Sequence, residues 1–111
     1  MNKSITESES GAKIEANPDG SFAVSGELNH QSVPALLQES NGVLFNGNTG
    51  ANADVAIDLA GVTRTDSAGV ALLIEWMRQA KRRNHSIHFK NMPKQMHDIA
   101  TVTGVDKMLV I

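Results

Sequence analysis

Alternation of apolar and polar residues is the first regular pattern along the chain. It runs over residues 12–16 and again over residues 22–26. Between these runs, Asn17-Pro18-Asp19-Gly20 has the composition of a turn. A period of two on both sides of a turn is typical of two antiparallel strands. The pattern therefore predicts a β-hairpin.

Helical spacing of apolar residues appears in three later segments. Residues 32–40 (SVPALLQES) predict a short helix with Ser32 at the N-cap position. Alternatively, this helix continues to Phe45. The strongest pattern covers residues 67–83. A third helix is predicted over residues 93–103, because Gly104 follows it as a C-terminal stop.

Apolar runs between the helices predict two further strands, at residues 54–59 and 86–91. Residues 46–52 (NGNTGAN) have the composition of a flexible loop, and residues 109–111 are a candidate for a last extended piece. The expected order is β-β-α-β-α-β-α. Strands that alternate with helices predict an α/β fold, with parallel crossovers and helices packed on the sheet.

Composition narrows the class of protein. A chain of 111 residues fits one domain, and residues 1–10 lack periodicity, so we expect a disordered tail before a domain over 11–111. The chain has no cysteine, which excludes thiolate sites and agrees with a reducing compartment. It contains no run of about 18 apolar residues and no apolar signal segment at its start. These features predict a cytosolic protein without direct membrane insertion.

Basic residues cluster in the second half of the chain. The cluster consists of Arg78, Lys81, Arg82 and Arg83, and it lies where the longest predicted helix ends. Cations at a helix C-terminus complement the helix dipole. An isoelectric point near 6.0 and the lack of interleaved aromatic residues argue against nucleic acid as a partner.

The run from Ile57 to Arg83, IDLAGVTRTDSAGVALLIEWMRQAKRR, resembles the STAS domain of anti-sigma-factor antagonists and sulfate-transporter tails. The resemblance rests on Asp58-Leu59, Val62, the Asp-Ser-Ala-Gly run at 66–69 and the apolar helix after it. Gly26-Glu27-Leu28 resembles a further element of that family, and residues 108–111 resemble its tail. The resemblance implies a mixed β-sheet with an N-terminal hairpin and helices packed on the sheet.

Within the family, the chain is most similar to MlaB-type subunits of the Mla phospholipid ABC transporter. Antagonists carry their phosphoacceptor serine immediately before the glycine, where this chain has Ala68. MlaB-type proteins place a Thr or Ser one residue earlier, here Ser67, the candidate regulatory or phosphorylation site. The resemblance implies a cytoplasmic subunit, peripheral at the inner membrane, that binds and regulates or stabilises the transporter ATPase and so maintains outer-membrane lipid asymmetry. The alternative is an anti-sigma-factor antagonist with a kinase as its partner.

Asp66 and Ser67 also invite a catalytic interpretation. A nucleophilic serine needs a base, and the spacing of the four histidines commits none of them to that role. Ser67 instead suits a helix N-cap, and Asp66 suits the positive end of the helix dipole. His85 and His88 lie on a predicted strand, where residues three apart point to opposite faces. We therefore expect no enzyme activity, no metal site and no cofactor.

The apolar face of the longest helix is wider than one sheet requires. Leu72 and Trp76 widen its stripe to about 200°. Such an excess is explained either by a shallow core or by an interface, in which tryptophan is enriched, and the sequence leaves both open. The candidate partner-binding residues are Arg64, Thr65, Asp66, Ser67, Ala68, Gly69, Leu72 and Trp76.

Overall fold

The computed structural model describes residues 11–41, 44 and 54–104 of the chain. Four predicted features lie outside these residues. They are the tail 1–10, the extension of the first helix to residue 45, the loop 46–52 and the final segment 108–111.

The order of the described elements is strand, strand, helix, strand, helix, strand, helix, as predicted. The strands are β1 (Ala12–Ala16), β2 (Phe22–Leu28), β3 (Asp54–Thr65) and β4 (Ser86–Lys90). The helices are α2 (Val33–Asn41), α3 (Ser67–Arg82) and α4 (Lys94–Thr103). Gly104 ends α4 in the left-handed conformation, which confirms the predicted stop.

The strands form one mixed sheet in the order β1-β2-β3-β4. β1 and β2 are antiparallel and make the predicted hairpin, whereas β2 and β3, and β3 and β4, are parallel. A parallel pair requires a crossover connection, and α2 and α3 lie within the two crossovers. The predicted α/β class, a mixed sheet with an N-terminal hairpin and helices, is confirmed.

Gly26 lets β2 continue past its partner Ala12, the first residue of β1. Its φ of 98° lies in the region that favours glycine, and a Cβ atom there would come within 2.8 Å of the Cα of Ala12. The pairing of β2 with β3 shifts register just after Gly26. β2 then runs on to Leu28, which pairs with Thr65 at the end of β3.

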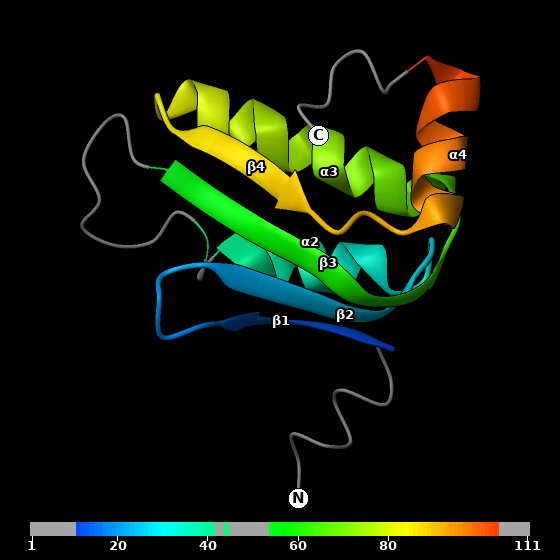
Figure 1. The fold of residues 1–111 in the computed structure, drawn as a ribbon, viewed down its shortest axis with the longest axis horizontal. Coiled ribbons are helices and arrows are strands. Elements are labelled where there is room, and N and C mark those ends of the chain that lie inside the picture. Colours follow the sequence, from blue (N-terminus) through cyan, green and yellow to red (C-terminus); the bar gives the residue numbers. More distant parts are fainter. Residues whose placement is uncertain (1–10, 42–43, 45–53, 105–111) are drawn as a thin grey trace, which may run out of the picture.

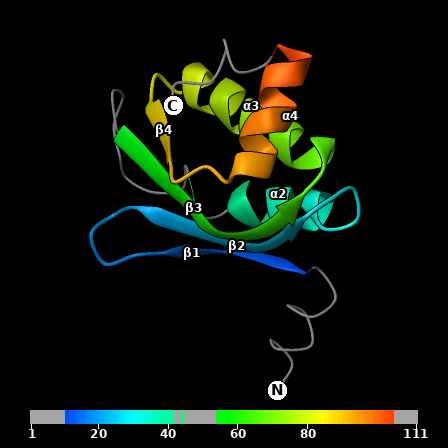
Figure 2. The same ribbon diagram turned by 45° about the vertical axis from the view of Figure 1, so that its right-hand side comes forward.

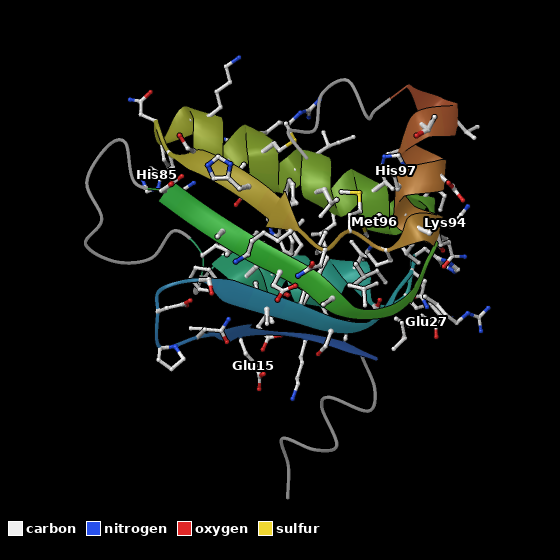
Figure 3. The ribbon with its side chains drawn as sticks, in the orientation of Figure 1. Glu15, Glu27, His85, Lys94, Met96 and His97 are labelled. Atoms are coloured by element: carbon white, nitrogen blue, oxygen red, sulfur yellow. The ribbon has the colours of Figure 1, made fainter. Side chains whose placement is uncertain are left out.

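Helices α2, α3 and α4 lie on the same side of the sheet, as the two ribbon views show (Figures 1 and 2). The side chains of Val55, Ile57 and Leu59 on β3 point toward these helices and are buried. Met96 extends from α4 into the same layer and is fully buried (Figure 3). The core therefore lies between one face of the sheet and the three helices.

β3 is longer than predicted. The expected strand ended at Leu59, but the observed strand continues to Thr65. Its buried positions alternate as far as Leu59 and then fall at Val62 and Thr65, so a period of two no longer applies. This part of β3 is held by pairing with β2, from Gly26↔Val62 to Leu28↔Thr65. Because these partners are distant in sequence, local periodicity does not reveal the extension.

Candidate functional site

The candidate site is formed where β3 ends and α3 begins. Asp66 joins them in an extended conformation (φ −119°), and its backbone N–H donates to the Leu28 carbonyl at 3.0 Å. Its Oδ1 accepts a hydrogen bond from the backbone N–H of Ala68 at 2.8 Å. Asp66 is therefore the N-cap of α3, and its negative charge lies at the positive end of the helix.

The prediction that Ser67 is the N-cap was wrong by one residue. Ser67 is already the first residue of α3, because Asp66 is the last one with extended backbone geometry. Its side chain is exposed, and no described side chain hydrogen-bonds to its hydroxyl. Ser67 thus presents an exposed hydroxyl on the first turn of the helix.

Thr65 connects the site to α4 through a hydrogen bond. It is buried, its hydroxyl donates to the Asp66 carbonyl at 2.9 Å, and its backbone N–H donates to Oε1 of Gln95 at 3.0 Å. Gln95 belongs to the first turn of α4, so the latter bond fixes the end of β3 against that helix. Sequence reasoning did not find Gln95, because 30 residues separate it from Thr65.

Gly69 is explained by close packing. A Cβ atom at this position would overlap the Thr65 hydroxyl, come within 3.0 Å of the Leu28 Cβ and within 3.3 Å of the Met96 Cε. The glycine lets α3 approach the end of the sheet and α4. It therefore serves the placement of the helix, and no phosphate-binding loop is needed to account for it.

His30 is a neighbour of the site that the sequence analysis missed. Its Nδ1 lies 3.7 Å from Oδ2 of Asp66, and the two side chains are 81% and 46% exposed. An exposed pair at this distance contributes little to stability. It does extend the surface at the start of α3 from the β3 end to the connection between β2 and α2. No local sequence signal links residues 36 positions apart.

Leu72 and Trp76 are core residues, which corrects their assignment to a partner-binding surface. Leu72 is 2% exposed and Trp76 is 0% exposed. The indole N–H of Trp76 donates to Oγ of Ser40 on α2 at 2.8 Å. The physical reason is that α3 packs against α2 and α4 as well as against the sheet. Three neighbouring elements account for the wide apolar face.

The exposed part of the predicted site is consequently small. Arg64 and Ser67 are exposed, Asp66 and Ala68 are half-buried, and Thr65 and Gly69 are buried beneath them. We call the surface formed by His30, Arg64, Asp66, Ser67 and Ala68 the α3 N-terminal surface. It carries a cation at Arg64, a carboxylate at Asp66 and a hydroxyl at Ser67.

The histidines near the two ends of β3 contact carboxylates. His30 contacts Asp66, and within the described part of the chain no hydrogen bond joins it to the Ser67 hydroxyl. Among the described residues, no three His, Asp or Glu side chains converge as a metal site. His88 instead pairs with Asp54 across neighbouring strands, with Nε2 at 2.9 Å from Oδ1. Over the described segments, no helix has the length and apolar character required to cross a membrane.

Comparison with known families identifies the domain. The family model described as "Mlab, STAS domain" matches residues 15–111. The chain belongs to this family of MlaB-like STAS domains. The Asp-Ser-Ala-Gly run at 66–69, on which the resemblance was based, forms the capped start of α3 in this STAS domain.

Solved structures share the STAS fold. The unphosphorylated anti-sigma factor antagonist SpoIIAA has a TM-score of 0.66 at 17% identity, with 89% of this chain and 85% of that chain covered. An anti-sigma factor antagonist from Mycobacterium paratuberculosis has a TM-score of 0.62 at 22% identity, covering 86% of this chain and 79% of that chain.

A longer protein also contains this fold. The structure of SLC26A9 matches with a TM-score of 0.64 at 12% identity, and the match covers 80% of this chain but only 16% of that chain. No curated protein matches the sequence significantly. At these identities the structural similarities establish the fold alone.

Proposed function

We propose that this STAS domain is a non-enzymatic subunit that binds the ATPase of a phospholipid ABC transporter of the Mla type. It stabilises or regulates that ATPase on the cytoplasmic side of the inner membrane, where it is held peripherally through its partner. The transporter would maintain the lipid asymmetry of the outer membrane. The observation that carries this proposal is the match of residues 15–111 to the MlaB-like family.

The α3 N-terminal surface is the proposed contact for the ATPase. Arg64 and Ser67 are exposed side chains on backbone that is fixed by the Asp66 cap and by the bond from Thr65 to Gln95. A preorganised surface loses little conformational entropy when a partner binds. The absence of a recorded base for Ser67 among the described residues supports a binding role over a catalytic one.

The second candidate function is that of an anti-sigma-factor antagonist with a kinase as its partner. It is favoured by the fold similarity to two structures with that description. Ala68 argues against this second function, because it occupies the position that the resemblance assigns to the phosphoacceptor serine of antagonists. Only Ser67 is available to substitute, and it is exposed on the first turn of α3. We therefore place the transporter function first.

Capture from native membranes tests the proposal directly. The full chain with an affinity tag is expressed in its own host, membranes are solubilised in mild detergent, and captured proteins are identified by mass spectrometry. We expect the ATPase and permease of one ABC transporter. Capture of a serine kinase of the sigma-regulating type would instead support the second function.

Two variants then test the contact surface against the purified ATPase. Arg64→Glu reverses an exposed charge, and Ser67→Glu places an anion beside Asp66, so each is expected to weaken binding at least tenfold. Arg78→Glu is the matched control, because Arg78 is also exposed but lies toward the other end of α3. Unchanged binding of both variants would move the ATPase contact away from the α3 N-terminal surface.

A turnover assay tests the non-enzymatic assignment. The isolated domain is incubated with ATP, and we expect no phosphate release above the buffer background. Turnover that is lost in Ser67→Ala, while the variant remains folded by circular dichroism, would contradict the proposal.

A further inference from the structure

The end of β3 is held from two sides. β3 pairs with β2 as far as Thr65, and the backbone N–H of Asp66 donates to the Leu28 carbonyl of β2 at 3.0 Å. Successive N–H groups of an extended chain point to opposite sides, so the Thr65 N–H points away from β2. It donates there to Oε1 of Gln95 at 3.0 Å. Gln95 thus binds the side of β3 that faces away from β2.

At this point a side chain takes the place of a neighbouring strand. β4 pairs with β3 from Asp54 to Asp58, β4 then ends at Lys90, and α4 begins at Lys94. Gln95 lies in the first turn of that helix, and its amide oxygen is a neutral acceptor, like a backbone carbonyl. β4 therefore supports the beginning of β3, and α4 supports its end.

The first turn of α4 is anchored in the core. Met96, the residue after Gln95, is fully buried, and its Cε would lie within 3.3 Å of a Cβ atom at Gly69 on α3. Met96 and Lys94, on either side of Gln95, lie at the end of the molecule where Glu27 is found near the end of β2 (Figure 3). One turn of α4 thus packs against both the end of β3 and the start of α3.

The bond from Thr65 to Gln95 acts on Arg64 through the backbone. The Thr65 N–H belongs to the planar peptide group that joins Arg64 to Thr65, so this bond fixes the orientation of that plane. The side chain of Arg64 is exposed and supplies a cation to the α3 N-terminal surface. Asp66 is fixed separately, by its own bond to Leu28. Within this surface, Arg64 is therefore the residue whose backbone Gln95 holds most directly.

We propose that Gln95 is a positioning residue for partner binding, which holds Arg64 in the orientation that the ATPase recognises. This inference rests on the proposed function, because it takes the α3 N-terminal surface as the contact for the ATPase. Without the acceptor, the peptide group before Thr65 samples more orientations, and the partner must order it on binding, which lowers affinity. Gln95 is exposed, so water replaces the lost oxygen and the variant retains the fold.

Amide exchange measures whether Gln95 holds the end of β3. The full ¹⁵N-labelled chain is compared with Gln95→Ala, which removes the acceptor, and with Gln95→Glu, which retains an acceptor oxygen at the same place in the side chain. We expect the Thr65 amide to exchange about tenfold faster in Gln95→Ala and within about twofold of the parent in Gln95→Glu. Lys94→Ala is the matched control, because Lys94 bonds to Asp98 of its own helix, and it should leave this exchange unchanged. An unchanged rate in Gln95→Ala would overturn the proposal.

Binding to the purified ATPase tests whether Gln95 acts through Arg64. Gln95→Ala should weaken binding about fivefold, and Gln95→Glu should bind within about twofold of the parent. In an Arg64→Ala background, Gln95→Ala should cause less than about a twofold further loss, because the side chain that it positions is already gone. A further loss of about fivefold in that background would mean that Gln95 contacts the partner directly. Equal affinities of the parent and Gln95→Ala would mean that the bond has a structural role only. Either result overturns the proposal.

The two measurements separate this inference from the proposed function. Failure of the parent chain to bind the ATPase would overturn the proposed function, together with the role of Gln95 in it. Exchange at Thr65 needs no partner, so it still shows in that case whether Gln95 holds the end of β3. Tight binding by the parent and by Gln95→Ala alike would instead overturn this inference alone and leave the proposed function in place.

Discussion

Replacement of Trp76 by alanine is the sharpest test of how α3 is packed. The side chain is 0% exposed and belongs to the hydrophobic core. Its indole N–H donates to Oγ of Ser40 at 2.8 Å, and that hydroxyl in turn donates to the Leu37 carbonyl at 2.7 Å. Trp76→Ala therefore removes a large buried surface and one end of a buried hydrogen-bond chain.

The expected loss of stability is large. Removal of a buried tryptophan side chain typically costs about 3–5 kcal/mol, because the surrounding atoms relax only partly into the cavity. A domain of this size has a free energy of unfolding of about 5–15 kcal/mol. The variant should thus lose a large share of its stability, and its Tm should fall by roughly 12–25 °C. Ser40→Ala, which leaves the buried indole N–H without its acceptor, should cost about 1–3 kcal/mol.

Urea unfolding followed by far-ultraviolet circular dichroism measures these changes. Arg78→Ala is the matched control on the same helix, and as an exposed substitution it should stay within about 0.5 kcal/mol of the parent. A loss of less than about 1 kcal/mol in Trp76→Ala, with an unchanged dependence on urea, would show that Trp76 is not packed as described. It would also restore the interpretation of Trp76 as an interface residue.

Three further predictions concern the site and Asp58 on β3. Gly69→Ala should destabilise the domain by about 1–3 kcal/mol in the same unfolding assay, because its Cβ would overlap the buried Thr65 hydroxyl. Asp66→Ala should cost about 0.5–2 kcal/mol as loss of the helix cap, whereas Ser67→Ala should change stability by less than about 0.5 kcal/mol; the reverse order would contradict the cap assignment. The hydrogen bond from Asn91 lowers the pKa of Asp58 below its ordinary value of 3.8, with the Ala60 N–H as a second cause. Because the pKa is lowered in the folded state, the charged Asp58 stabilises the protein above the unfolded-state pKa, and this contribution is lost as pH falls through the folded-state pKa. The difference in stability between the parent and Asp58→Asn should therefore shrink from pH 6 to pH 3.

The sequence by itself determined the order of the elements and the class of the fold. The two hairpin strands, α3 and the glycine stop of α4 carry local signals, since periodicity, turn composition and a C-terminal glycine depend on neighbouring residues only. The Asp-Ser-Ala-Gly run also led to the correct family, and the helix was correctly predicted to begin at Ser67, although its cap is Asp66. Because these features depend on interactions between residues close in sequence, the sequence pattern is sufficient to predict them.

The tertiary structure decided which of those residues reach the surface. The sequence pattern at Leu72 and Trp76 is the same whether a partner protein or other parts of the domain cover them. Only the packing of α3 against α2, α4 and the sheet shows that they are buried. His30 and Gln95 join the site through contacts with residues 36 and 30 positions away, which no local pattern records. A hollow of about 450 Å³ between the end of α3 and β4 likewise exists because these two elements lie side by side. Burial, long-range hydrogen bonds and concave surfaces depend on distances between elements, and those distances are set by packing.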